Sequence, residues 1–167
     1  MRTKRNIVII AHNLRSTHNV GAILRTAEGL GINKVYLTGY TPYPLSKNDS
    51  RLPHLAAKIT KDIHKTALGA ESSQAWSFKD NVIGVINKLK QAGYSVAALE
   101  QTSQSKNLAT YQAPARIAIV VGREVEGIEK DILKLCDLCV EIPMKGNKES
   151  FNVTQALAMA LYQFSYF

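Results

Sequence analysis

The strongest constraint on the fold of this chain is the alternation of short apolar runs with stretches of helical periodicity. The apolar runs have the length of buried strands, and they cover residues 7–11, 35–37, 94–99, 117–121 and 138–142. The stretches between them have the spacing of amphipathic helices, and they cover residues 19–30, 57–67, 82–92, 129–136 and 153–164. This order predicts an α/β fold with a mostly parallel sheet flanked by helices.

The length of the chain favours a single domain. Its 167 residues with 46% hydrophobic content suffice for one core, and no repeat or low-complexity segment divides them, so we expect one domain over residues 1–167. Residues 38–57 are rich in Pro, Ser and Asn and are predicted to form a long loop, a kind of segment that is often functional. No apolar run approaches the roughly 20 residues that span a bilayer, and the two cysteines, interpreted as structural thiols in a reducing cytosol, indicate a cytoplasmic protein.

The positive charge of the chain is concentrated in its first part. The net charge is +8, and residues 1–65 hold 11 Lys or Arg against 3 Asp or Glu, whereas residues 66–167 hold 10 of each kind. A one-sided basic surface attracts phosphate groups, although the same charge also serves solubility. On charge alone, the two interpretations are equally open.

Cys136 and Cys139 form a lone CxxC pair. Such a pair is typical of redox chemistry or of half a zinc site. No second cysteine pair exists, and the four histidines all lie within the first 64 residues. Because both cysteines lie in an apolar stretch, we interpret them as structural thiols in a reducing compartment and expect no metal.

Three polar segments each follow a predicted strand, the place where ligands bind in open α/β sheets. The first is HNLRSTHNVGAILRTAEGLG, with Gly21 between Asn19 and Arg25. Asn19 is predicted to cap the following helix, and Gly31 to end it. Arg25 is either an ordinary surface arginine or a boundary side chain whose guanidinium binds a phosphate or carboxylate.

The second segment is IAIVVGREVEGI, and it contains Gly122, Glu124 and Gly127. Glycine after a strand either forms a plain turn or lets the backbone approach a ligand closely. The P-loop pattern GxxxxGK[ST] and the dinucleotide pattern GxGxxG are absent. The third segment, VEIPMKGNKESFNVTQALAMAL, places Ser150 and Asn152 before the last helix, with Asn152 as the closer N-cap candidate.

In this order the three segments resemble the motifs of the SpoU (TrmH-like) branch of the SPOUT class of RNA ribose 2′-O-methyltransferases. The family patterns are Asn-x-Gly-x-x-x-Arg, Gly-x-Glu-x-x-Gly and Ile-Pro-Met-x-Gly…Ser-Leu-Asn-Val, and they match residues 19–25, 122–127 and 142–153. One departure is Phe151, where the family usually has leucine. The resemblance covers most of the chain.

The resemblance implies a C-terminal deep trefoil knot, which no residue pattern indicates and which general topology rules make rare. It also implies a homodimer whose active site is assembled at the subunit interface, and no membrane contact. The implied methyl donor is S-adenosylmethionine, with S-adenosylhomocysteine as its product and no metal. The implied substrate is a ribose 2′-hydroxyl in tRNA or rRNA.

The resemblance also assigns roles to the matching positions. Arg25 would activate the hydroxyl, Asn19 would orient the ribose or phosphate, and Glu124 would position Asn19, Arg25 or backbone amides. The catalytic candidates are Arg25, Asn19, Glu124, Ser150 and Asn152. The cofactor-binding candidates are Gly122, Ile142, Met144 and Phe151, with Leu99 and Glu100 as looser candidates after another strand. Simple core packing is an alternative explanation for Ile142 and Phe151.

The basic first part of the chain supplies the candidates for RNA binding, which are Arg15, Lys47, Arg51, Lys58, Lys61 and Lys65. Tyr40 and Tyr43 are candidates for stacking on a base, although ordinary packing explains them as well. Two other functions remain open, an RNA-binding knotted protein without catalysis and an unrelated α/β nucleotide-binding module. The presence of all five catalytic candidates argues against the first, and the missing Walker and GxGxxG patterns argue against common forms of the second.

Overall fold

The computed structural model describes residues 5–167, which form a seven-stranded sheet in the order β3-β2-β1-β6-β4-β7-β5. Every neighbouring pair of strands is parallel, as the sequence predicts. The strands are β1 Asn6–His12, β2 Lys34–Thr38, β3 Trp76–Lys79, β4 Ser95–Leu99, β5 Lys106–Asn107, β6 Arg116–Val121 and β7 Leu138–Glu141. The helices are α1 Thr17–Gly29, α2 Pro53–Ala67, α3 Ala70–Ser73, α4 Val82–Gln91, α5 Lys130–Leu135 and α6 Val153–Tyr166.

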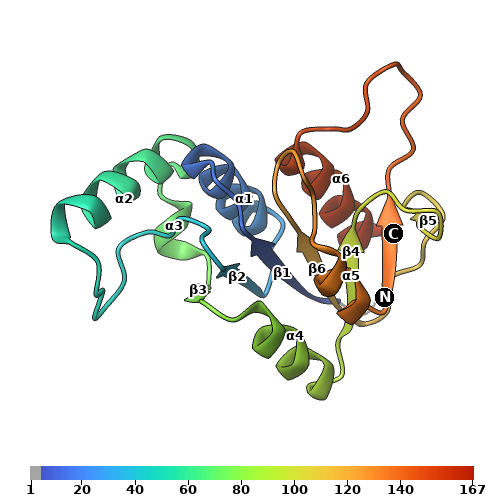
Figure 1. Cartoon of the computed structure of the whole chain (residues 1–167), viewed down its shortest axis with the longest axis horizontal. Helices are drawn as coiled ribbons and strands as arrows, with labels where there is room; N and C mark the ends of the chain where they lie inside the picture. Colours follow the sequence, from blue (N-terminus) through green and yellow to red (C-terminus); the bar gives the residue numbers. More distant parts are fainter. Residues whose placement is uncertain (1–4) are drawn as a thin grey trace.

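Helices cover both faces of the sheet, with α1 and α6 on one face and α4 and α5 on the other (Figure 1). Strand side chains alternate between the two faces, so Ile7 and Ile9 face one layer, while Val8 and Ile10 face the opposite one. The central strands are therefore buried on both sides, which explains why they are continuous apolar runs in the sequence.

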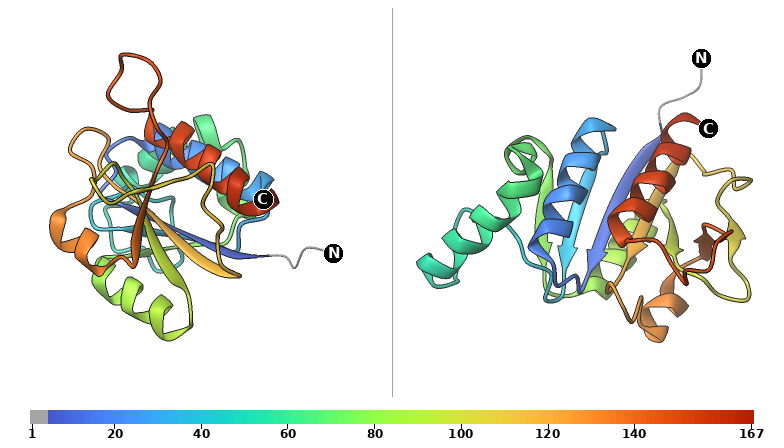
Figure 2. Two further views of the ribbon diagram at one scale, coloured as in Figure 1. Left: turned by 90° about the vertical axis from the view of Figure 1, so that its right-hand side faces the viewer. Right: turned by 90° about the horizontal axis from the view of Figure 1, so that it is seen from above.

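Helix α1, which carries the first motif, is positioned by its packing against α2. Helix α1 crosses α2 so closely that a Cβ on Gly21 would lie 2.9 Å from the backbone nitrogen of Ala67 and closer still to the carbonyl of Ile63. A glycine at this position is therefore a packing requirement. Helix α1 also lies beside α6 in both views of Figure 2, so the helix that carries the first motif is next to the helix that follows the last motif.

The structure corrects two expectations about the start of helices. The N-cap of α1 is Ser16, whose side chain accepts a hydrogen bond from the backbone of Asn19 at 3.2 Å, so the prediction that Asn19 caps the helix is wrong. Helix α2 begins at Pro53 rather than near residue 57, because proline suits the first helical turn. The remaining loop covers residues 39–52. Gly31 adopts φ +65° just after α1, as expected of a helix stop.

Two short elements have no counterpart in the sequence prediction, and β3 corresponds only to a short apolar piece around Trp76. Strand β5 has two exposed residues at the edge of the sheet, and α3 is a single turn, so neither carries an apolar pattern. Within residues 5–167 no helix has the length and apolar character needed to cross a membrane. Cys136 and Cys139 are free thiols, and burial raises the pKa of Cys136 to about 12, which keeps it protonated.

Candidate functional site

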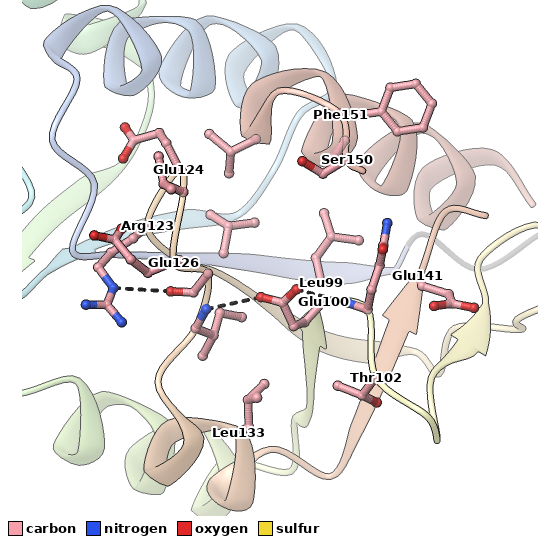
Figure 3. Close-up of a pocket in the computed structure, with 18 of the residues that line it drawn as sticks. Leu99, Glu100, Thr102, Arg123, Glu124, Glu126, Leu133, Glu141, Ser150 and Phe151 are labelled. Atoms are coloured by element: carbon pink, nitrogen blue, oxygen red, sulfur yellow. Dashed lines mark hydrogen bonds between the residues drawn. The ribbon is translucent and has the colours of Figure 1, made fainter. Parts of the chain in front are cut away.

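A cavity of about 570 Å³ lies at the carboxyl ends of β4, β6 and β7 and is closed by the start of α6 (Figure 3). Ligands bind at this end of the strands in open α/β sheets. Seven of the predicted site residues line it, namely Leu99, Glu100, Gly122, Glu124, Ile142, Ser150 and Phe151. The cavity therefore brings together the second and third motifs and the end of β4. Its lining does not include Met144, Asn19, Arg25 or Asn152.

The loop after β6 forms one wall of the cavity and depends on two glycines. Arg123 and Gly127 form an antiparallel bridge. The backbone nitrogen of Arg123 donates to the Gly127 carbonyl at 3.2 Å, and the backbone nitrogen of Gly127 donates to the Arg123 carbonyl at 3.1 Å. A Cβ on Gly122 would lie 2.8 Å from that carbonyl, and Gly127 has φ +71°. Both positions need glycine, and Gly122 packs directly against Gly127 and Ile128 of the same loop.

Three carboxylates hold this loop in place, and Glu100 is the first. One of its oxygens accepts a hydrogen bond from the backbone nitrogen of Ile128 at 3.1 Å, and the other accepts from Gln101 at 3.0 Å. Figure 3 shows the Glu100 side chain reaching from the end of β4 toward this loop. Glu100 therefore fixes the cavity wall.

Glu124 connects the same loop to the beginning of α1. Its carboxylate accepts hydrogen bonds from the side-chain amide of Asn19 at 3.1 Å and from the backbone nitrogens of Ser16 and Arg15 at 3.2 and 3.3 Å. Burial alone would raise the pKa of Glu124, but these donors outweigh burial and lower it. The first two motifs are thus joined through Glu124 and Asn19.

The third carboxylate belongs to a polar cluster that the sequence analysis missed. Asn13 donates to Glu129 at 2.8 Å and accepts from the backbone of Tyr40 at 3.1 Å, so it joins the loop after β2 to the start of α5. The buried His12 ring lies 3.6 Å from Glu129, and Arg123 lies 3.7 Å from it. Burial, opposed by Glu129, lowers the pKa of His12. The signal in the sequence was the polar pair His12–Asn13 directly after a buried strand.

The start of α6 forms the opposite wall of the cavity. Asn152 is the N-cap, and its side chain accepts from the backbone of Thr154 at 2.9 Å, which confirms the N-cap prediction and occupies this oxygen. Ser150 and Phe151 line the cavity just before the helix, and Phe151 is exposed. Residues 143–152 form a loop that projects from the molecule (Figure 1).

The lining of the cavity carries more acid than base. Its cationic side chains are Arg123 and Lys130, and its carboxylates are Glu100, Glu124, Glu126 and Glu141. This excess favours a ligand with positive charge. Apolar side chains, including Leu99, Ile142 and Phe151, supply surface for an aromatic ring. Among the residues that the structure describes, no group of three or more His, Cys, Asp or Glu is arranged to hold a metal ion.

Arg25 lies outside this cavity. It is exposed on α1, between the buried Leu24 and Ala27. Glu124 reaches the first turn of the same helix, whereas Arg25 is nearly two turns further on. In a single copy of the chain, the guanidinium of Arg25 is therefore not part of the cavity wall.

The RNA-binding candidates fall into two groups. Lys47, Lys58, Lys61 and Lys65 are exposed on the loop after β2 and on α2. Arg51 instead holds its own loop together, with hydrogen bonds to Asp49 at 2.8 Å and to the Tyr43 carbonyl at 2.9 Å.

The two tyrosine candidates for base stacking have different surroundings. The centre of the Tyr43 ring lies 3.6 Å from the guanidinium carbon of Arg51 and 4.0 Å from the centre of the Phe78 ring, so packing explains Tyr43. Tyr40 is 52% exposed. Arg15 is exposed and paired with Glu126 at 3.3 Å.

The parallel sheet has an acidic cavity beyond its strands, and the sequence has neither a P-loop nor a dinucleotide glycine pattern. These features define a ligand-binding α/β protein that is neither a P-loop protein nor a dinucleotide-binding protein. The model of the SpoU rRNA Methylase family matches residues 6–162, and the chain belongs to this family. The chain is 27% identical over 165 residues to a tRNA (guanosine(18)-2′-O)-methyltransferase of Aquifex aeolicus, covering 97% of this chain and 70% of that protein.

Other relatives are longer than this chain. A putative TrmH family tRNA/rRNA methyltransferase of Staphylococcus haemolyticus is 28% identical over 156 residues, and the alignment covers 93% of this chain but 57% of that protein. The fold matches the crystal structure of an AdoMet-bound rRNA methyltransferase from Sinorhizobium meliloti with a TM-score of 0.78 at 18% identity, covering 96% of this chain and 56% of that one.

Proposed function

We propose that this chain is an S-adenosylmethionine-dependent RNA methyltransferase that methylates a ribose 2′-hydroxyl of tRNA or rRNA. The observation that carries the proposal is the cavity in which the second and third SpoU motifs meet at the carboxyl ends of β4, β6 and β7. The printed names of the Aquifex and Sinorhizobium relatives support the reaction and the cofactor.

The residues of the cavity fit this methyl donor. S-adenosylmethionine has a sulfonium and an ammonium against one carboxylate, so the acidic lining attracts it. The apolar side chains suit the adenine, and the close packing of Gly122 against Gly127 and Ile128 holds the loop that forms one wall of the cavity. The volume of about 570 Å³ is in the range of about 300–1,000 Å³ for such ligands. When bound, the cofactor supplies an activated methyl group and leaves as S-adenosylhomocysteine.

The protein side of the reaction is alignment and management of charge. Arg25 remains protonated near neutral pH, so we assign it to an RNA phosphate and to the negative charge that develops on the 2′-oxygen. Glu124 positions Asn19 through the observed hydrogen bond. Ser150 and Asn152 shape the site at the start of α6, where the helix dipole favours anions.

The proposal includes a homodimer in which Arg25 reaches the cavity of the partner. Two observations support this. Arg25 is exposed and absent from the cavity of its own chain. Large apolar side chains on the neighbouring α6 are also exposed, including Met159 at 38% and Tyr162 at 53%, as is common at protein interfaces.

We also propose that residues 1–167 act as a single cytoplasmic methyltransferase domain with the family's C-terminal trefoil knot. The similarity of fold to the Sinorhizobium enzyme supports the knot. The free thiols of Cys136 and Cys139 support a reducing compartment.

The direct test is to incubate the protein with isotope-labelled S-adenosylmethionine and total RNA, digest the RNA and identify the labelled nucleosides by mass spectrometry. The proposal predicts label on 2′-O-methyl groups. Label on bases, or S-adenosylhomocysteine binding without any transfer to an RNA pool lacking the modification, would contradict it.

The role of Arg25 has its own prediction. Arg25→Lys keeps the charge but removes the planar, bidentate geometry, so kcat should fall by at least about tenfold, or about 1.4 kcal/mol of transition-state stabilisation. The affinity for S-adenosylhomocysteine should be unchanged. A lysine variant with normal kcat would show that the guanidinium geometry is irrelevant.

A further inference from the structure

A second cavity of about 630 Å³ lies between α4 and the β2–β3 edge of the sheet, away from the residues of the proposed active site. The buried side of α4 packs on β1, β4 and β6. Figure 1 shows α4 below the sheet, with β3 at the left-hand edge. The β2–β3 part of this face is thus left as a groove, whose polar lining includes Lys34, Ser77, Lys79, Asn81 and Lys88.

Three lysines from three different elements converge on this groove. Lys34 begins β2, Lys79 ends β3 and Lys88 lies in the last turn of α4. Lys34 is partly buried, with its ammonium 5.8 Å from the centre of the Tyr36 ring and 3.2 Å from the Trp76 carbonyl that it donates to. Burial first, and then the charges of Lys79 and Lys88, lower the pKa of Lys34, so the ammonium group of Lys34 lies within reach of the positive charges on the other two lysines.

No carboxylate of the described residues forms an ion pair with these three ammonium groups. Lys65 and Lys90 form ion pairs with carboxylates at 2.6 and 2.8 Å. Asp80 is the one carboxylate in the lining, which leaves an excess of positive charge. Converging unpaired cations in a hollow are stabilised by an anion.

We infer that this groove binds the phosphodiester backbone of the RNA substrate, on a surface separate from the methyl-transfer site. The inference rests on the proposed function. Lys79, Asn81, Gly84 and Lys88 are exposed, so the groove is open to solvent along its length and suits a polymer that passes through it. Lysine supplies flexible point charges for phosphates, and Tyr36 and Asn81 add hydrogen-bonding groups.

The first test replaces all three lysines, as Lys34→Gln, Lys79→Gln and Lys88→Gln together, and measures the affinity for bulk tRNA at several salt concentrations. Each lost phosphate contact lowers the magnitude of the slope of log affinity against log salt by about 0.7–0.9, so the loss of three contacts should lower it by about 2.1–2.7. Between about 50 and 200 mM salt the loss of affinity should therefore be roughly 20- to 40-fold smaller for the variant than for the wild type. An unchanged slope would overturn the inference.

The second test uses a matched pair of variants on α4. Gly84→Glu introduces a carboxylate into the groove, and a Cβ there makes only ordinary contacts, the nearest being Asn81 at 3.6 Å. Ile83→Glu makes the same charge change on the adjacent residue, which is 45% exposed and outside the lining. Glutamate is favourable in the first turn of a helix, so both variants should fold. The affinity for tRNA should fall more for Gly84→Glu, and equal losses would refute a local site.

The remaining measurements separate this inference from the proposed function. The triple variant should keep wild-type affinity for S-adenosylhomocysteine and raise the KM for tRNA without changing kcat. If the wild type transfers methyl groups while the groove variants bind tRNA normally, the inference alone fails. Saturable binding of inorganic phosphate that depends on the three lysines, together with unaltered tRNA binding, would assign the groove to a small phosphate compound and reject the RNA site.

Discussion

At the scale of single residues, the cavity depends on Gly122 most directly. Its backbone passes so close to Gly127 that a methyl group would lie 2.8 Å from the carbonyl oxygen. Gly122→Ala should therefore displace the loop that lines the cavity and weaken S-adenosylhomocysteine binding by about tenfold or more, or at least about 1.4 kcal/mol. Isothermal titration calorimetry measures this. Gly146→Ala is the control, because Gly146 belongs to the third motif but a Cβ there meets nothing within 4 Å. Equal affinities for both variants would contradict the assignment.

The carboxylate of Glu124 makes stability depend on pH. Because its pKa in the folded protein is lowered from the ordinary value of 4.5, its contribution is fully present above that value and is lost as the pH falls through the folded pKa. Glu124→Gln should lower the free energy of unfolding by about 1–3 kcal/mol at pH 7, since the amide cannot accept all the hydrogen bonds that the carboxylate accepts. The difference should shrink below about pH 4. Denaturant titrations at both pH values test this, and a difference independent of pH would show that the ionised form has no special role.

At the scale of helices and strands, Gly21 sets the crossing of α1 and α2. Gly21→Ala should lower the free energy of unfolding by about 1–3 kcal/mol, as overpacking does. Gly29→Ala lies on the same helix with open space around its Cβ, and it should leave stability unchanged or raise it by up to about 1 kcal/mol. Chemical denaturation of the two variants measures their free energies of unfolding and separates the effect of packing from the effect of helix propensity. A fully stable Gly21→Ala protein would mean that the motif glycine serves another purpose.

The sequence predicted the elements whose residues carry a periodic signal and missed those that do not. The central strands are apolar on both faces, so β1, β4 and β6 were evident. Strand β5 is exposed and pairs only with β7, so its two residues look like a loop. Glu124 could be named from its motif. Its partners, the backbone nitrogens of Arg15 and Ser16, could not, because backbone donors have no sequence signature. The cluster around Glu129 was missed because its members lie in distant segments.

At the scale of the whole molecule, the first motif lies on α1, the last lies in the loop that leads into the adjacent α6, and the second lies in a loop beyond the sheet. Glu124 joins α1 to the cavity, but Arg25 lies too far along α1 to line it. We therefore expect one active site to be built from two chains. We also predict a dimer in solution, because the exposed apolar side chains of α6 are next to α1. A monomeric but fully active protein, by analytical ultracentrifugation at assay concentration, would contradict it.

The most direct measurement of this shared site is complementation between two inactive variants. Gly122→Ala disables the cofactor cavity and Arg25→Ala removes the guanidinium, so each homodimer should transfer methyl groups poorly. When the two are unfolded, mixed in equal amounts and refolded, half of the dimers should be mixed, and each should hold one intact site. Methyl transfer to RNA should then recover to about a quarter of the wild-type rate. Activity that stays at the level of the separate variants, while mass spectrometry shows mixed dimers, would place Arg25 and the cavity of the same chain in one site and contradict the account.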